Sequence, residues 1–243
     1  MVDQSNAARL KIRPRVLRDV SRIDTSTRIF GKDYPYPISI SPSAMHQLAH
    51  KDGELATSRA AASQGLTMTL STFSTTSLED VIKAGKEFER EDGIPPPEYW
   101  MQLYCFQNRS TSESLIRRAE AAGYKAVVLT VDTPYLGRRH HELRNKFELP
   151  PNVRLGNFAP DSNKAQPPSQ REEDVAKLVE NEHKGKKPKI GGAVQVVSGS
   201  GNGKSLHGCL LNILDPSISW EETIPWLKSI TSMKIILKVL LQW

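Results

Sequence analysis

Short apolar runs alternate with amphipathic stretches along the chain, at intervals of about thirty residues, which is the spacing of βα units. Five of the runs are rich in apolar and β-branched residues and end at turn residues, as β-strands do. They cover residues 38–42, 67–72, 100–106, 126–132 and 234–239. Several are apolar almost throughout, and this favours a parallel sheet that is covered on both faces.

Helical patterns lie between these runs. The clearest begins at Ser77, a good N-cap residue, and carries Glu79 and Asp80 in its first turn, where the helix dipole favours acidic side chains. Another ends at Gly123, a typical C-terminal cap. Helices are predicted over residues 52–64, 77–84, 111–122, 172–183 and 220–230. The alternation of strand and helix predicts an α/β protein with a parallel sheet.

The connection between the fourth and fifth strands is unusually long and rich in Gly, Pro, Ser and Lys. It predicts a flexible insert at about 160–210 within one domain that covers residues 1–243. The net charge is +6, and part of the excess gathers here, at Lys184, Lys186, Lys187 and Lys189. No aromatic residues or recognition helix accompany these lysines, so we expect no nucleic-acid partner.

Composition narrows the class of protein further. With 243 residues and 38% hydrophobic residues, the chain suits one large α/β domain and is not disordered. No run approaches the ~20 apolar residues of a membrane helix, so no membrane association is expected. The absence of a secretory signal and of a C-terminal peroxisomal tripeptide predicts an intracellular, cytoplasmic protein. Cys105 and Cys209 are too few for a disulfide framework or a four-cysteine metal site, and no metal is expected.

Polar side chains stand at the ends of all five predicted strands. They are Ser43, Ser71, Thr72, Gln102, Tyr104, Thr130, Asp132 and Lys238. Gln102 and Tyr104 are two residues apart, so both point to one side of their strand. Thr130 and Asp132 have the same spacing. The carboxyl ends of parallel strands form the ligand-binding edge of α/β proteins, and a shared pocket is therefore predicted there.

Several strings resemble the FMN-dependent α-hydroxy-acid dehydrogenase and oxidase family, to which glycolate oxidase belongs. They are SPSAM at 41–45, LTVDTPYLGRR at 129–139, RNKFELPP at 144–151 and DPSISW at 215–220. The resemblance covers nearly the whole chain outside about 160–210. It implies a (β/α)8 TIM barrel, of which this chain holds about the first five βα units. It also implies FMN as cofactor, a small L-2-hydroxy acid as substrate, a 2-keto acid as product and a homo-oligomer for intact members. The electron acceptor remains open.

The resemblance assigns cofactor-binding roles at the strand ends. The residues implied to contact FMN are Pro42, Ser43, Ala44, Ser71, Gln102, Thr130 and Lys238. The first three would run along the flavin with their backbone. The ammonium of Lys238 would lie beside N1 and O2 of the ring, where reduced flavin gathers negative charge.

The resemblance also assigns substrate and catalytic roles. Arg139 would bind the substrate carboxylate through two parallel hydrogen bonds, which its planar guanidinium suits. Phe73 would shape the substrate pocket, and Tyr104 would hydrogen-bond the substrate. Asp132 would orient a catalytic histidine and stabilise its imidazolium.

The family's histidine base belongs to a His-Gly-x-Arg-Gln motif that these 243 residues do not contain. The only His-Gly pair, His207-Gly208, is followed by Cys209 and does not match. The glycine-rich strand segments that hold the FMN phosphate have no counterpart either. The sequence therefore predicts an incomplete barrel, truncated at both ends, in which the family activity is impaired or absent.

Two further functions stay open at this point. One is a non-catalytic flavin-binding or interaction fragment that keeps part of the fold. The other is a P-loop nucleotide binder, because residues 198–205 read SGSGNGKS. Ser198 stands where that motif requires its first glycine, which favours an ordinary Gly/Ser loop.

Overall fold

The computed structural model describes residues 15–91, 94–133, 140–145, 147–158 and 213–239. The chain divides into two compact units, Met1–Pro37 and Ile38–Trp243. Each unit is described separately below. The predicted insert at about 160–210 and the predicted helix at 172–183 lie outside the described residues.

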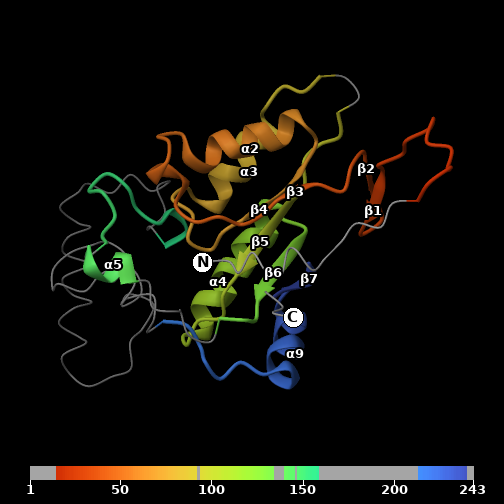
Figure 1. The fold of residues 1–243 in the computed structure, drawn as a ribbon. Coiled ribbons are helices and arrows are strands. Elements are labelled where there is room, and N and C mark those ends of the chain that lie inside the picture. The colour runs from red at the N-terminus through yellow and green to blue at the C-terminus, as the bar shows by residue number, and fades with distance from the viewer. Residues whose placement is uncertain (1–14, 92–93, 134–139, 146, 159–212, 240–243) are drawn as a thin grey trace, which may run out of the picture. The chain divides into compact units, whose positions relative to one another are not determined.

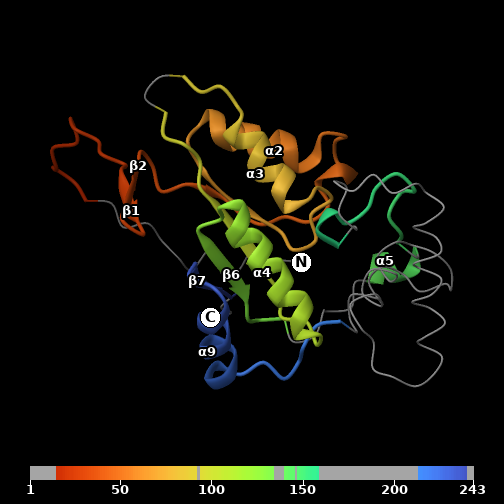
Figure 2. The same cartoon turned by 180° about the vertical axis from the view of Figure 1, so that it is seen from behind.

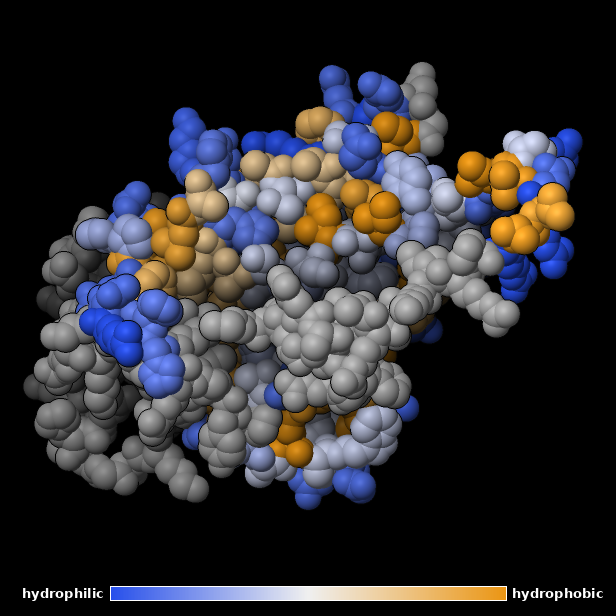
Figure 3. Space-filling view, in the orientation of Figure 1, coloured by the Kyte–Doolittle hydropathy of each residue, from blue (hydrophilic) through white to orange (hydrophobic). Residues whose placement is uncertain are grey.

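The N-terminal unit contains a β-hairpin that the sequence pattern does not predict. Its antiparallel strands are β1 (Thr27–Ile29) and β2 (Lys32–Tyr34), joined by Phe30 and Gly31. Both turn residues have positive φ, 50° and 86°, as a type I′ hairpin turn requires. Strands of this length are too short for an alternation of apolar and polar residues to be recognised in the sequence. The unit also exposes large apolar side chains, among them Leu17 and Ile23. Figure 3 shows hydrophobic residues in orange on the surface of the molecule.

The second unit is built on a five-stranded parallel sheet in the order β3-β4-β5-β6-β7. The strands are β3 (Ser39–Ile40), β4 (Thr67–Leu70), β5 (Tyr99–Leu103), β6 (Ala126–Thr130) and β7 (Lys234–Lys238). All five strands predicted from the sequence are confirmed, although each ends one to three residues earlier than predicted. Each strand pairs with the next one along the chain. This order is that of a barrel wall and differs from a doubly wound sheet, whose strand order reverses.

The helices confirm the predicted caps. The main helices are α2 (Gly53–Ser63), α3 (Leu78–Lys86), α4 (Arg109–Ala122) and α9 (Trp220–Ile230), and the short ones are α5 (His140–Arg144), η1 (His46–Leu48) and η2 (Gly156–Phe158). Ser77 caps α3 by accepting from the Asp80 amide at 3.2 Å, and Gly123 ends α4 with φ 100°. Helix α4 starts before the predicted residue 111 because Asn108 caps it. No helix in the described part of the chain is long and apolar enough to cross a membrane.

One face of the sheet forms the core with the helices. The helix residues Val81, Leu115 and Ile116 belong to the same buried cluster as alternate residues of three strands. These strand residues are at most 1% exposed and are Met68, Leu70, Met101, Leu103, Val127 and Leu129. Figure 1 shows the strands and Figure 2 shows α4 in front of them from the other side. The alternation leaves the intervening residues, many of them polar, to the opposite face.

Candidate functional site

A hydrogen-bonded network joins the carboxyl ends of β4, β5 and β6. The Gln102 Nε2 donates to Thr130 Oγ1 at 3.0 Å, and its Oε1 accepts from the Thr72 amide at 2.9 Å. The Thr72 hydroxyl in turn donates to the Gln102 carbonyl oxygen at 2.6 Å. Gln102 is 2% exposed and Thr130 3%, so these bonds fix the side chains in an interior where an unpaired amide is costly.

Lys238 extends this row of polar groups to the next strand. It is the register partner of Thr130 and therefore lies beside it on the same face of the sheet. The Val131 amide donates to the Lys238 carbonyl oxygen at 3.1 Å, which continues the pairing past the end of β6. Lys238 is half-buried, and its ammonium can stabilise negative charge brought to this edge.

Ser71 follows β4 and is 5% exposed. Its Oγ accepts from the Phe73 amide at 3.2 Å, so the hydroxyl proton can serve as a donor. Ser71, Gln102, Thr130 and Lys238 thus lie at the same end of four neighbouring strands. An amide, two hydroxyls and an ammonium are a donor set that suits the carbonyl oxygens and ring nitrogens of a heteroaromatic ligand.

Phe73 and Tyr104, the two aromatic residues predicted to contact substrate, lie against each other. Their rings stack with centroids 5.4 Å apart. Phe106 and Phe158 complete the cluster, with centroids 6.3 and 6.1 Å from that of Phe73. The sequence analysis placed Phe106 at the end of a predicted strand without linking it to this site. It missed Phe158 because that residue is 85 residues from Phe73 and belongs to no predicted element.

The loop after β3 contains Pro42, Ser43 and Ala44. Ser43 and Ala44 are exposed, and Pro42 is half-buried. Just beyond them, Met45 has a left-handed backbone with φ 60° and donates its amide to the Phe73 carbonyl oxygen at 3.2 Å. This bond brings the loop next to the segment that follows β4.

A buried carboxylate holds these two loops together, and the sequence analysis did not single it out. Glu54, which is 0% exposed, accepts from the His46 amide at 3.0 Å and the Thr75 amide at 2.9 Å. It also accepts from the hydroxyls of Thr75 and Thr76 at 2.6 and 3.0 Å. Burial raises the pKa of Glu54, but the hydrogen bonds from Thr75 and His46 outweigh burial and hold the pKa below its usual value.

The remaining predicted residues follow β6. Asp132 is half-buried and accepts a hydrogen bond from the Thr133 hydroxyl at 3.2 Å. Arg139 lies outside the described residues. Within the part of the chain that is described, no cluster of His, Cys, Asp and Glu could hold a metal ion.

A parallel sheet with sequential strand order and polar groups at its carboxyl edge defines an α/β protein of the barrel type, with a candidate ligand site at that edge. The family model of FMN-dependent dehydrogenases matches residues 3–243, and the chain belongs to this family. The predicted family and fold class are therefore confirmed.

Relatives and solved structures agree with this assignment. The chain is 38% identical over 235 residues to human 2-hydroxyacid oxidase 1, covering 97% of this chain and 53% of the human protein. It is also 38% identical to glycolate oxidase 1 of Oryza sativa subsp. indica, covering 95% and 51%. A crystal structure of mandelate oxidase with (S)-4-hydroxymandelic acid aligns with TM-score 0.71 and 29% identity, covering 98% and 54%. The chain spans about half the length of the curated relatives it matches.

Proposed function

We propose that this chain forms the part of a flavin site that binds the FMN ring and a small L-2-hydroxy acid. The reaction served is oxidation of that acid to the 2-keto acid, as the names of the matched hydroxyacid, glycolate and mandelate oxidases suggest. Bound FMN supplies the acceptor for the two electrons removed from the substrate. The observation that carries the proposal is the row formed by Gln102, Thr130 and Lys238 on three neighbouring strands.

The protein groups suit a flavin ring in kind and position. The Ser71 hydroxyl, the Gln102 amide and the Thr130 hydroxyl bind the polar edge of the ring. The Lys238 ammonium stabilises the negative charge that the ring acquires on reduction. The backbone of Pro42, Ser43 and Ala44 passes along the ring, on a loop that the Met45–Phe73 hydrogen bond ties to the end of β4.

The substrate is held next to this row. Arg139 binds its carboxylate as a bidentate pair, Tyr104 hydrogen-bonds it, and Phe73 limits its size through the stacked aromatic cluster. In a site with a histidine base, Asp132 would orient that histidine. Because the 243 residues contain no His-Gly-x-Arg-Gln motif, we expect this chain alone to oxidise hydroxy acids slowly or not at all. General-base catalysis typically contributes about 10²–10⁴-fold to the rate.

The lack of that motif also favours a second candidate function, a flavin-binding or interaction protein without catalysis. Turnover separates the enzyme from a non-catalytic flavin-binding protein, and a lack of flavin binding would leave the interaction role. The P-loop candidate, residues 198–205, lies outside the described residues and gains no support.

The test is a fluorescence titration of the chain with FMN, followed by turnover of glycolate, lactate and mandelate with an artificial electron acceptor. Saturable quenching supports the flavin site, and an unchanged signal contradicts it. Lys238→Met should weaken FMN binding about tenfold, the effect of losing one hydrogen bond to a charged group. Lys234→Met is the matched control, because Lys234 lies at the opposite end of β7 and is exposed. Turnover close to that of intact oxidases would show that another residue serves as the base.

A further inference from the structure

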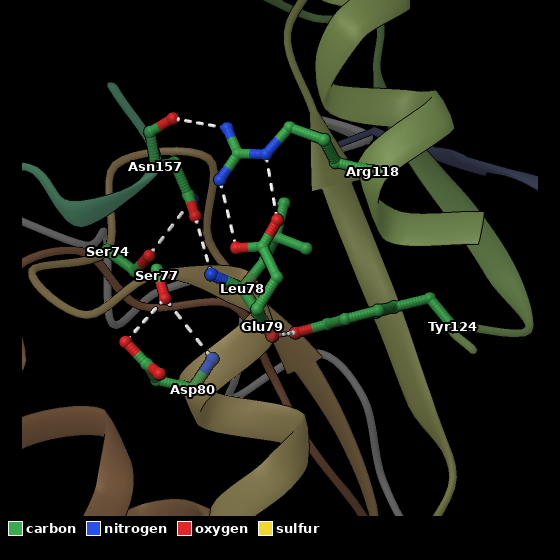
Figure 4. Close-up of polar contacts among 8 residues, drawn as sticks. All are labelled: Ser74, Ser77, Leu78, Glu79, Asp80, Arg118, Tyr124 and Asn157. Atoms are coloured by element: carbon green, nitrogen blue, oxygen red, sulfur yellow. Dashed lines mark hydrogen bonds and ion pairs between the residues drawn. The ribbon is translucent and has the colours of Figure 1, made fainter. Parts of the chain in front are cut away.

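Asn157, in the short helix η2, reaches both ends of the connection between β4 and α3. The two N–H groups of its Nδ2 are shared among three acceptors, the carbonyl oxygens of Ser71 and Thr72 at 3.3 and 3.0 Å and Ser74 Oγ at 3.0 Å. Its Oδ1 accepts from the Leu78 amide, the first of α3, at 2.9 Å. Figure 4 shows the side chain pointing at Ser74 and Leu78. The residue is 2% exposed, so water does not replace these bonds when they are lost.

The backbone around Asn157 is fixed as well. The Gly156 amide donates to the Ser74 carbonyl oxygen at 3.0 Å, and a Cβ on Gly156 would overlap the backbone of Thr76. From the other side, Arg118 Nη1 donates to the Asn157 carbonyl oxygen at 2.7 Å. The same guanidinium makes a two-pronged pair with Glu79 at 2.8 and 2.9 Å, which Figure 4 also shows. Asn157 is therefore a fixed point against which the connection is held.

The connection held in this way contains residues of the candidate site. Ser71 is in it, and so is Thr72, whose amide donates to Gln102 Oε1. Phe73 is in it too, and its ring packs against that of Phe158, the residue after Asn157. A shift of the β4 end would move a flavin-binding hydroxyl and break the link to Gln102 together. Holding such groups in place before the ligand arrives lowers the entropic cost of binding.

We propose that Asn157 is a positioning residue of the flavin site. It fixes the end of β4 so that the Ser71 hydroxyl and the Gln102 amide meet the polar edge of the flavin ring in one geometry. The effect on flavin binding rests on the proposed function, whereas the effect of Asn157 on the end of β4 can be measured without flavin. The two are therefore tested separately, on the full chain.

The first measurement is amide hydrogen exchange without FMN. In Asn157→Ala, the amides of Leu78 and Thr72 should exchange about tenfold faster, while those of Val127 in β6 stay unchanged. Gly156→Ala, which displaces the same segment, should give the same local pattern. Asn108→Ala is the matched control, because its side chain also accepts an amide at a helix start, that of Ser110 at 3.2 Å. Unchanged exchange at Leu78 and Thr72, or equal acceleration throughout the chain, would overturn the proposal.

The second measurement is the Kd for FMN. Asn157→Ala should raise it roughly fivefold, and Asn108→Ala should leave it unchanged. If Asn157 acts through Ser71, the loss in Ser71→Ala/Asn157→Ala will be smaller than the sum of the two single losses. Fully additive losses would overturn the positioning role. A chain that binds no FMN but shows the local exchange change would instead overturn the proposed function and support the hold of Asn157 on β4.

Discussion

The two faces of the parallel sheet differ in what their side chains do. The face that packs on the helices carries, in β4, β5 and β6, Met, Leu and Val side chains at most 1% exposed, which stabilise the fold through the apolar area they bury. The opposite face carries Gln102, Thr130 and Lys238 at the carboxyl ends of its strands. Thr130 and Gln102 are as inaccessible to solvent as many core residues. Their hydrogen bond pairs buried polar groups but adds little net stability. Burial therefore does not distinguish the residues of the candidate site from the core, whereas their polarity at the strand ends does.

The largest loss of stability is expected from a substitution on the helix-covered face of the sheet. Leu103→Ala should lower the free energy of unfolding by about 2–5 kcal/mol, because the residue is 0% exposed and its removal leaves a cavity among rigid neighbours. Urea denaturation followed by circular dichroism measures the change. Leu48→Ala is the control, since Leu48 is 44% exposed and its loss should change stability by less than about 0.5 kcal/mol. Similar losses in both variants would show that the sheet face does not form the core.

A smaller loss of stability is expected on the polar face. Gln102→Leu removes the acceptor of the Thr72 amide and the donor to Thr130, and should cost about 1–3 kcal/mol through the buried groups left unpaired. Gln107→Leu is the matched control: Gln107 is exposed and donates one side-chain bond, to the Leu214 carbonyl oxygen at 3.1 Å. Gln102→Leu should also abolish saturable FMN quenching, whereas Leu103→Ala should weaken it only as far as the protein unfolds. An FMN affinity that survives Gln102→Leu would separate this network from the flavin site.

The contrast between the apolar and the polar face of the sheet also explains which features can be predicted from the sequence. Apolar runs report buried strands directly, so all five strands and the Ser77 and Gly123 caps follow from local pattern. The strand-end polar residues also have a local signal, because a polar residue ending an apolar run is unusual. Glu54 and Asn157 have no such signal, because glutamate and asparagine side chains normally face solvent. Their roles arise only from partners that folding brings near, 21 residues away for Glu54 and Thr75 and 79 for Asn157 and Leu78.

The carboxylate of Glu54 makes the polar loops sensitive to acid. Its pKa is lower in the folded chain than its ordinary value of 4.5, so its hydrogen bonds add stability fully above that pH and lose it as pH falls through the folded pKa. Glu54→Gln removes this contribution. The stability difference between wild type and variant, measured by urea denaturation, should be largest at neutral pH and shrink below about pH 4. Glu113→Gln, which alters the exposed pair with Arg117, should show almost no difference at either pH. A difference for Glu54→Gln that stays constant with pH would contradict an ionised carboxylate at this position.

The smallest effect is measured as the reactivity of a buried thiol and reports how well the helices cover their side of the sheet. Cys105 lies two residues after β5 and is 4% exposed, and burial raises the pKa of its thiol to about 11 although the nearby Arg109 acts to lower it. Alkylation requires the thiolate, so a Cys209→Ala chain, whose only thiol is Cys105, should react with iodoacetamide far more slowly when folded than in urea. Leu103→Ala on the same background should speed the reaction by opening the packing around the thiol. Gln102→Leu should change it less, because the Gln102 side chain bonds to Thr72 and Thr130 on the opposite face. Equal acceleration by the two substitutions would mean that the two faces open together, and that the polar strand ends contribute to closing the core as much as the leucines do.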